Sequence, residues 1–277
     1  MSPHEDASRL AKRWRVPSGS AIDLRAMDTA STDDAPGDKE ANTETLPVLR
    51  DRLAELQERL YAEGRRSLLL VLQAMDAGGK DGTIKHVFRG VNPQGTTVTS
   101  FKVPTPEEAA HDFLWRVHRA TPRHGEIGIF NRSHYEDVVV VRVHGRVGPD
   151  VWRDRYDHIS AFEANLAAAG TKVVKLFLHI SKEEQAERLR RRLERHDKRW
   201  KFRAGDLDER RRWDDYMAAF AAAIGATSTD EAPWYVVPAD RKWYRNWVVS
   251  QIVIGALESM DPQYPEAEEG LDGVVVE

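Results

Sequence analysis

Short apolar runs alternate with segments of helical periodicity along most of the chain. The run from Leu68 to Leu72 is uninterrupted, as expected for a strand that is buried on both faces. Before it, leucines recur every three or four residues from Leu49 to Leu60, which predicts an amphipathic helix that starts near Pro47. The other runs with strand character are 96–103, 126–130, 172–180 and 234–237.

Capping signals indicate where helices begin between these strands. From Thr105, a Thr-Pro-Glu-Glu sequence combines an N-cap, a first-turn proline and a capping-box glutamate. Ser181, with Glu184 three residues later, is a second such box. The run 138–143 is compatible with a helix or a strand, because periodicity does not decide so short a run. The predicted helices are 105–119, 151–169, about 181–196, about 206–224 and a last one that Asp240 caps and that ends near Met260.

This alternation predicts an α/β fold, a three-layer sandwich with a mostly parallel sheet and helices on both faces. In such folds ligands bind at the carboxyl ends of the strands. The length of 277 residues suits one such domain, expected at 47–260. Residues 1–46 are predicted to be a partly mobile N-terminal arm and 261–277 a loose acidic tail. The apolar residues of the arm that could dock are Leu10, Trp14 and Val16.

Composition excludes some chemistry. The absence of cysteine excludes disulfides, thiolate metal sites and cysteine nucleophiles. The net charge of −4 argues against general nucleic-acid binding, although it is compatible with a local basic patch. The first residues lack a signal-peptide pattern and no apolar run is long enough for a membrane span. We therefore expect a cytoplasmic protein with neither a membrane nor a nucleic-acid partner.

A glycine-rich loop follows the first strand and leads into a helix. Its sequence is Ala74-Met-Asp-Ala-Gly-Gly79, followed by Lys80. This is the layout of a phosphate cradle, in which backbone N–H groups and a helix N-terminus attract an anion, although an ordinary glycine-rich turn is the alternative. The match to G-x-x-x-x-G-K-[ST] is imperfect, because Ala74 replaces the first glycine and Asp81 replaces the hydroxyl residue. Asp76 would repel phosphate unless a cation such as Mg²⁺ lay between them.

The third predicted strand ends in Asn131 and Arg132, where an acid is expected in a nucleotide-binding sheet. Asn131 can offer a carbonyl oxygen to a metal or orient a metal-bound water, but a turn-forming asparagine explains it nearly as well. Arg132 could contact a transferring phosphoryl group. Glu136 and Asp137 are alternative sources of negative charge.

Basic residues dominate 188–203, which holds nine lysines and arginines against Glu194 and Asp197. Four of the arginines are spaced to share one helical face, which suits an extended polyanion better than a plain solvated face does. Inorganic polyphosphate and nucleotide phosphates fit better than nucleic acid, because no stacking Phe, Tyr or Trp interleaves with the arginines from Arg188 to Arg199. The turn 196–205 is predicted to form a mobile lid hairpin within about 183–216.

Several motifs together resemble the polyphosphate kinase 2 family over roughly Pro47 to Met260. They are Ala74-Met-Asp-Ala-Gly-Gly-Lys-Asp-Gly-Thr-Ile-Lys-His86, Gly90-Val-Asn-Pro-Gln-Gly95, His111-Asp-Phe-Leu-Trp-Arg116, Ile129-Phe-Asn-Arg-Ser133, Lys198-Arg-Trp-Lys-Phe202, Gly205-Asp-Leu and Trp213-Asp-Asp-Tyr216. The resemblance implies a P-loop kinase-like fold with a helical lid. It also implies reversible, Mg²⁺-dependent phosphoryl transfer from inorganic polyphosphate to nucleoside mono- and diphosphates, AMP to ADP and ADP to ATP, with Mn²⁺ as a possible replacement metal.

The resemblance also implies roles for single residues. Asp76, Lys80 and Arg132 would be catalytic, and Asp76 and Asn131 would bind the metal. Many members have Asp in place of Asn131, and the subgroup with Asn is similar in acting on both AMP and ADP. The residues implied to bind phosphate are Ala77, Gly78, Gly79, Lys80, Asp81, Gly82 and Thr83. The lid residues implied to contact polyphosphate are Arg188, Arg192, Arg195, Arg199 and Lys201. The candidate contacts to the acceptor nucleotide are Asp112, Arg116 and Glu136.

Two other functions are compatible with parts of the sequence. An ATP-dependent nucleoside monophosphate kinase would share the fold, although the dense basic run favours a longer polyanion than ATP. A non-catalytic protein that binds polyphosphate or nucleic acid would bind without turnover. The resemblance further implies a homo-oligomer, for which eight tryptophans and an apolar last helix offer surfaces.

Overall fold

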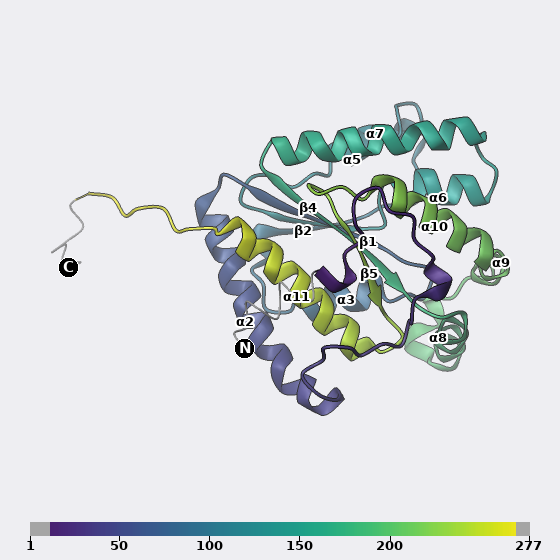
Figure 1. The fold of residues 1–277 in the computed structure, drawn as a ribbon, viewed down its shortest axis with the longest axis horizontal. Helices are drawn as coiled ribbons and strands as arrows, with labels where there is room; N and C mark the ends of the chain where they lie inside the picture. The colour runs from purple at the N-terminus through teal and green to yellow at the C-terminus, as the bar shows by residue number, and fades with distance from the viewer. Residues whose placement is uncertain (1–11, 270–277) are drawn as a thin grey trace.

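A computed structural model describes residues 12–269, and its centre is a five-stranded sheet (Figure 1). Every neighbouring pair is parallel, in the order β2-β3-β1-β4-β5. The strands are β1 (Ser67–Gln73), β2 (Thr96–Ser100), β3 (Ile127–Asn131), β4 (Thr171–His179) and β5 (Trp234–Pro238). The α-helices are α2 (Lys39–Glu63), α3 (Lys80–Val87), α4 (Pro106–Ala109), α5 (Trp115–His118), α6 (Glu136–Val143), α7 (Pro149–Ala168), α8 (Lys182–Glu194), α9 (Gly205–Arg211), α10 (Trp213–Thr227) and α11 (Lys242–Met260); 3₁₀ turns are η1 (Leu24–Ala26), η2 (Pro93–Gly95) and η3 (His196–Lys201).

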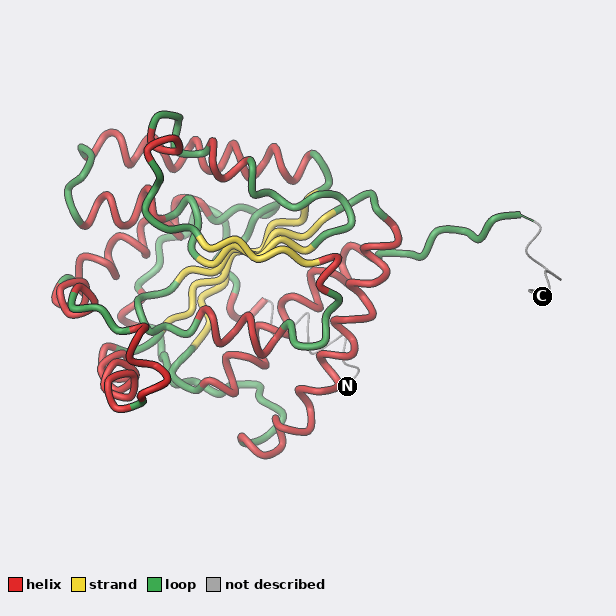
Figure 2. Tube along the Cα trace, turned by 180° about the vertical axis from the view of Figure 1, so that it is seen from behind, coloured by secondary structure: helices red, strands yellow, loops and turns green. Residues whose placement is uncertain are grey.

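Helices cover both faces of the sheet, which confirms the predicted three-layer α/β sandwich. Helices α2, α3 and α11 pack together on one face, and α6, α7 and α10 pack on the other (Figures 1 and 2). Helices α8 and α9, with η3 between them, lie at one end of the molecule, away from the C-terminal tail. All seven residues of β1 are buried, as the uninterrupted leucine run predicts for a central strand.

The first long helix begins at Lys39, so the predicted start near Pro47 is wrong. Asp38 is its N-cap, and the carboxylate accepts hydrogen bonds from the N–H groups of Glu40 and Ala41 at 2.9 and 3.1 Å. This cap satisfies two free N–H groups, so the helix forms upstream and includes Pro47 as an interior residue. Residues 39–46, which the sequence assigned to the arm, therefore belong to α2.

The arm packs against the sheet where the structure describes it. Trp14 and Val16 are buried, as predicted, and the Val16 N–H donates to the Trp234 carbonyl at 2.8 Å. Arg15 forms an antiparallel bridge with Tyr235 of β5. Leu10, the third expected docking residue, lies outside the described residues. Of the tail, residues 261–269 contain no helix or strand and the remainder lies outside the described residues.

Several predicted helices differ in extent from the observed ones. The capping box of Thr105 and Glu108 forms, but the helix ends at Ala109 and a second short helix follows, since the Asp112 carboxylate captures the Leu114 N–H at 2.9 Å. The predicted helix 206–224 is divided into α9 and α10 at Arg212. The undecided run 138–143 is helical and belongs to α6.

Two expected caps also differ. Ser181 accepts the Glu184 N–H at 3.0 Å, but the Glu184 carboxylate contacts Arg188. Asp240 does not cap α11; its carboxylate accepts hydrogen bonds from the Ser181 N–H and the Thr29 hydroxyl. In residues 12–269, no helix has the length and apolar character needed to cross a membrane.

Candidate functional site

The glycine loop between β1 and α3 has the closed shape of an anion-binding turn. The Gly78 N–H donates to the Met75 carbonyl at 2.9 Å, and Ala77 and Gly79 have positive φ angles of 61° and 104°. A Cβ at Gly78 would lie 2.5 Å from the Ala74 Cβ, so only glycine fits there. Ala74, which replaces the first glycine of the usual motif, is therefore packed closely against Gly78.

Lys80, the first residue of α3, is held over this loop. Its Nζ donates to the Ala74 carbonyl at 3.0 Å. Burial and the nearby Arg132 lower the pKa of Lys80 to about 8, although Asp76, Glu136 and Asp81 act in the opposite direction. The Lys80 side chain therefore holds its charge less firmly than an exposed lysine does, and a bound anion would favour the protonated form.

Asp76 is brought together with residues from the end of β3. Arg132 donates to the carboxylates of Asp76 at 2.6 Å and of Glu136 at 2.9 Å. The Glu136 carboxylate, together with Asp76, raises the pKa of Arg132. The two predicted catalytic residues Asp76 and Arg132 therefore share one ion-pair cluster, and Glu136 joins them.

Arg132 has an unusual backbone, with φ at +63°. A non-glycine residue in this region is strained, so the chain around it must be anchored. The next three residues, Ser133, His134 and Tyr135, are fully buried. The Tyr135 hydroxyl oxygen lies within hydrogen-bond distance of the Glu163 carboxylate, at 3.0 Å, and of the Thr227 hydroxyl, at 2.8 Å. These buried contacts hold the segment that presents Arg132 and Glu136.

Asp81 joins three parts of the molecule at the start of α3. Its carboxylate accepts from the Asn131 side chain at 2.9 Å and from the Lys201 ammonium at 2.5 Å. Burial opposes ionisation, but Lys201 and Asn131 hold the pKa of Asp81 below its usual value. Asp81 thereby connects the lid, through Lys201, to the end of β3.

The side chains available to a divalent cation are few. Asp76, Asp81 and Asn131 supply hard oxygen atoms, and Mg²⁺ characteristically takes one or two protein carboxylates and completes its shell with water and phosphate oxygens. Within 12–269 no three or more acidic, histidine or cysteine side chains form a ready metal cage. The donor set fits a cation that is shared with a phosphate substrate.

The four lid arginines do not share one helical face, because α8 ends at Glu194 and residues 196–201 form η3. Arg188 is buried and all five of its N–H donors are used, at 2.5 to 3.1 Å. The acceptors are the Glu184 carboxylate and the carbonyls of Ala77, Gly78, Ala239 and Asp240. In this conformation Arg188 stabilises the loop through its hydrogen bonds to the loop carbonyls.

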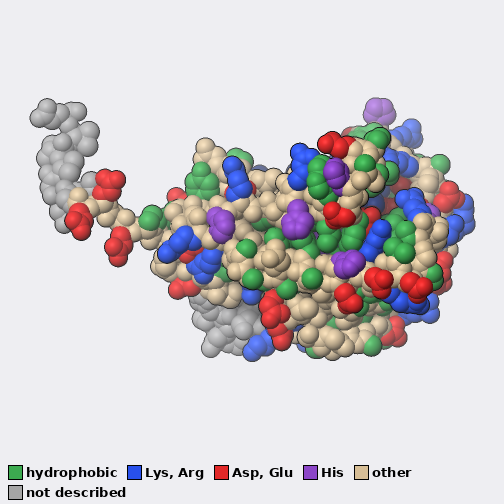
Figure 3. All heavy atoms as spheres, turned by 90° about the horizontal axis from the view of Figure 1, so that it is seen from above, with side chains coloured by type: hydrophobic (Ala, Val, Ile, Leu, Met, Phe, Trp, Pro, Cys, Tyr) green, Lys and Arg blue, Asp and Glu red, His purple; other side chains and the backbone are tan. Residues whose placement is uncertain are grey.

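The other lid cations lie nearer the surface. Arg192 is 3.7 Å from Asp206, Arg195 pairs with Asp197, and Arg199 donates to the Leu193 carbonyl. Figure 3 shows basic and acidic side chains interspersed at the end of the molecule opposite the tail. The contact of these residues with polyphosphate stays a prediction.

The three acceptor candidates lie in different surroundings. Glu136 belongs to the Arg132 cluster. Arg116 is buried, donates to the Lys102 carbonyl at 2.8 Å and lies 3.4 Å from Asp137, next to that cluster. Asp112 is exposed and makes no hydrogen bond to the loop among the residues described.

Three residues that sequence reasoning did not select also adjoin the site. Gln185 donates to the Asp76 carbonyl at 2.9 Å, and burial together with the Asp76 charge raises the pKa of Asp206. Arg245 of α11 is buried against Gly79. Only Arg245 carried a sequence signal, as an isolated charge in an apolar helix.

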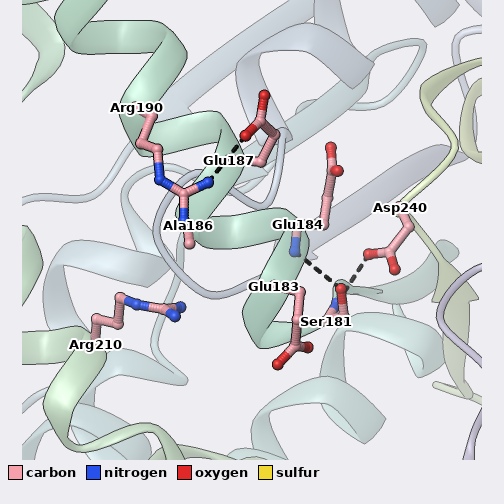
Figure 4. A pocket seen from close by; sticks show the side chains of 8 residues that line it. All are labelled: Ser181, Glu183, Glu184, Ala186, Glu187, Arg190, Arg210 and Asp240. Atoms are coloured by element: carbon pink, nitrogen blue, oxygen red, sulfur yellow. Dashed lines mark hydrogen bonds and ion pairs between the residues drawn. The ribbon is translucent and has the colours of Figure 1, made fainter.

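A separate hollow of about 480 Å³ lies beside the start of α8 (Figure 4). Four carboxylates line it, against two arginines, and one of these, Arg190, is paired with Glu187. Its acidic lining does not suit a polyanion, so this hollow is a poor candidate for the phosphate site.

The order of the parallel sheet, the glycine loop after its central strand and the helical lid together define a P-loop kinase-like phosphotransferase. The sequence model described as Polyphosphate kinase 2 (PPK2) matches residues 37–265. The chain belongs to this family, which confirms the resemblance seen in its motifs.

Similar proteins cover nearly the whole chain. It is 55% identical to an AMP/ADP-polyphosphate phosphotransferase of Meiothermus ruber, over 96% of this chain and 100% of that protein. It is 45% identical to an ADP-polyphosphate phosphotransferase of Rhodopseudomonas palustris, over 92% of each. A crystal structure of Polyphosphate Kinase 2 from Arthrobacter aurescens TC1 superimposes with a TM-score of 0.91 at 44% identity, covering 95% of this chain and 94% of that one.

Proposed function

We propose that this enzyme transfers the terminal phosphoryl group of inorganic polyphosphate to AMP and to ADP, reversibly and with Mg²⁺. The observation that carries the proposal is the Asp76–Arg132–Glu136 cluster at a phosphate loop, in a chain 55% identical to an AMP/ADP-polyphosphate phosphotransferase. Mn²⁺ is the expected substitute metal, because it also accepts hard oxygen ligands.

In this proposal the loop and Lys80 bind the donor phosphates. Backbone N–H groups of the loop and the start of α3 attract the anion, and the Lys80 ammonium adds a full charge. A bound divalent cation would neutralise charge on the transferring group. Asp76 and Asn131 are the residues proposed to hold it, with Asp81 as an added candidate.

Arg132 and Asp76 are proposed to act at the reacting group. Arg132 would move from Asp76 to the transferring phosphoryl group, where its fork matches phosphate oxygens. Once Arg132 has moved away, the Asp76 carboxylate would anchor the cation or accept a proton from the acceptor phosphate. Phosphoryl transfer depends on positioning and charge stabilisation, so no covalent enzyme intermediate is required.

The lid is proposed to close over the donor chain. Arg192, Arg195, Arg199 and Lys201 would contact successive phosphates, whereas Arg188 would support the loop from behind. Glu136, Arg116 and Asp112 are the proposed contacts to the acceptor nucleotide. We also retain self-association and a cytoplasmic site of action as proposals, and sedimentation tests the former.

A product time course tests the function. The protein is incubated with Mg²⁺ and either AMP or ADP, with and without long-chain polyphosphate. ATP formed from ADP, and ADP formed from AMP, only when polyphosphate is present are the expected results. Transfer from ATP to AMP that matches or exceeds transfer from polyphosphate would instead identify an ATP-dependent monophosphate kinase, and binding without turnover a non-catalytic protein.

A further inference from the structure

Arg245 is a charged residue inside an otherwise apolar part of the last helix. It is the only Asp, Glu, Lys or Arg between Trp243 and Leu257, and 2% of its surface is exposed. Helix α11 packs beside α3, the helix that starts at the phosphate loop (Figure 1). A full charge in this position requires an explanation, because charges are rarely buried without a partner.

The guanidinium of Arg245 lies directly against the loop. A Cβ placed on Gly79 would be 2.1 Å from its Nη1, and one on Gly82 would be 3.5 Å from its Nη2. The positive charge therefore sits behind the turn at which α3 begins. Gly79 must be glycine partly because this guanidinium occupies the neighbouring space.

No carboxylate among residues 12–269 is paired with Arg245. Its Nε and Nη2 both donate to the neutral Asn246 side chain, at 3.2 and 2.8 Å. The nearby Arg188 is different, because Glu184 balances its charge at 2.7 Å. Burial and the neighbouring Arg188 lower the pKa of Arg245 to about 9. The ligand-free protein thus holds one unbalanced buried cation behind its phosphate loop.

We propose that Arg245 is a positioning residue of the donor-phosphate site, an uncompensated buried charge that is balanced only when polyphosphate occupies the loop. This inference rests on the proposed function, since it takes the loop to be the site of the donor. The unbalanced charge lowers the stability of the empty protein and strengthens the binding of an anion, because the interior screens the attraction weakly.

A purely packing role makes the opposite prediction. If Arg245 only filled the space between α11 and α3, a neutral side chain of similar length would leave a worse fit and a less stable empty protein. It would leave anion binding at the front of the loop unchanged.

The experiment compares thermal unfolding of the full chain with and without inorganic tripolyphosphate, and KM and kcat with long-chain polyphosphate. The variants are Arg245→Met, Arg245→Gln and Arg245→Lys. The control is Lys85→Met, which removes an exposed cation from α3. Wild-type turnover is measured in parallel and tests the proposed function independently.

Both neutral variants are expected to melt no lower than the wild type when empty, and their stabilisation by tripolyphosphate should fall by at least half. KM for polyphosphate should rise about tenfold, while kcat changes less. Arg245→Lys and Lys85→Met should retain most of the wild-type stabilisation.

Neutral variants that melt lower or do not fold would overturn the inference, as would undiminished stabilisation by tripolyphosphate. Because wild-type turnover is unaffected by these outcomes, failure of this inference is distinguishable from failure of the proposed function.

Discussion

Asp76 lies in the loop between β1 and α3, and Arg132 donates to its carboxylate at 2.6 Å. Arg132 reaches it from a strained backbone that buried neighbours fix in place. Single residues of the site are therefore positioned by ion pairs that a phosphate substrate would have to rearrange.

Asp76→Asn is expected to lower kcat by about 10²-fold or more, because it removes the charge proposed to anchor the cation or accept a proton. The fold should survive, since the amide has the size of the carboxylate. The measurements are kcat with polyphosphate and ADP and the circular dichroism spectrum. Asp51→Asn, the same change at an exposed position of α2, is the control. A near-normal kcat in Asp76→Asn would contradict the proposed role of the Asp76 charge.

The depressed pKa of Lys80 predicts a pH dependence. Its ammonium is protonated below a pKa of about 8 and loses its charge above it, while Arg132 and the carboxylates of Asp76, Glu136 and Asp81 surround it. Because the donor is an anion, KM for polyphosphate should rise with pH between 7 and 9, by at most about tenfold per pH unit.

Steady-state kinetics across that range measure this dependence. Lys80→Arg keeps its charge throughout, so its KM should remain flat. Lys80→Ala should lower turnover by orders of magnitude at every pH. A wild-type KM that is constant from pH 7 to 9 would contradict the role of the Lys80 proton.

At the scale of elements, an exposed ion pair lies between the predicted lid and α3. Lys201 of η3 reaches Asp81, whose side chain is 63% exposed, and Asp81 also accepts from Asn131 at the end of β3. An ion pair so open to water holds the lid weakly. This ion pair is therefore a weak restraint on the part of the predicted lid around Lys201.

Lys201→Met is expected to accelerate amide hydrogen exchange across 195–205, because it removes the tie between lid and α3. Global stability should change by less than about 1 kcal/mol. Lys198→Met is the matched control, since Lys198 lies in the same turn but near Asp197, at 3.6 Å. Equal exchange rates in the two variants would show that Lys201 does not restrain the lid.

At the scale of the whole molecule, a buried ionic network joins β4 to α7, to α10 and to the segment between β3 and α6. Lys175 of β4 donates to Glu163 of α7, to the Tyr135 hydroxyl at 3.1 Å and to the Thr227 carbonyl at 2.7 Å. Burial lowers the pKa of Lys175, and Lys175 with His134 keeps the pKa of Glu163 low despite its burial. The same network anchors the segment that carries Arg132.

Lys175→Met should destabilise the protein by about 3–5 kcal/mol, because it leaves Glu163 buried without a counter-charge. Adding Glu163→Leu removes that unpaired charge, so the double variant should recover part of the loss. Urea unfolding measures both. A double variant that is as unstable as the sum of the single variants would show that the charges are not coupled.

Much of the fold was predictable from the sequence because it depends on local patterns. The leucine run predicted β1, and the strand–loop–helix pattern predicted the phosphate loop and α3. Both Asp38 and Pro47 were possible start signals for α2, and the helix starts directly after Asp38. The Asp38 cap stabilises the helix end by accepting hydrogen bonds from two N–H groups, whereas a proline is only tolerated in a first turn.

The sequence by itself determined the order of strands and helices, the loop with Asp76 and Lys80, and the family, since each lies in residues close together in the chain. Tertiary structure alone decided that Arg188 donates to carbonyls of the loop, that Asp240 binds Ser181 and Thr29 instead of capping α11, and that Arg245 reaches Gly79. The physical reason is that the partner of a charge is selected by packing between distant segments, which local periodicity does not encode.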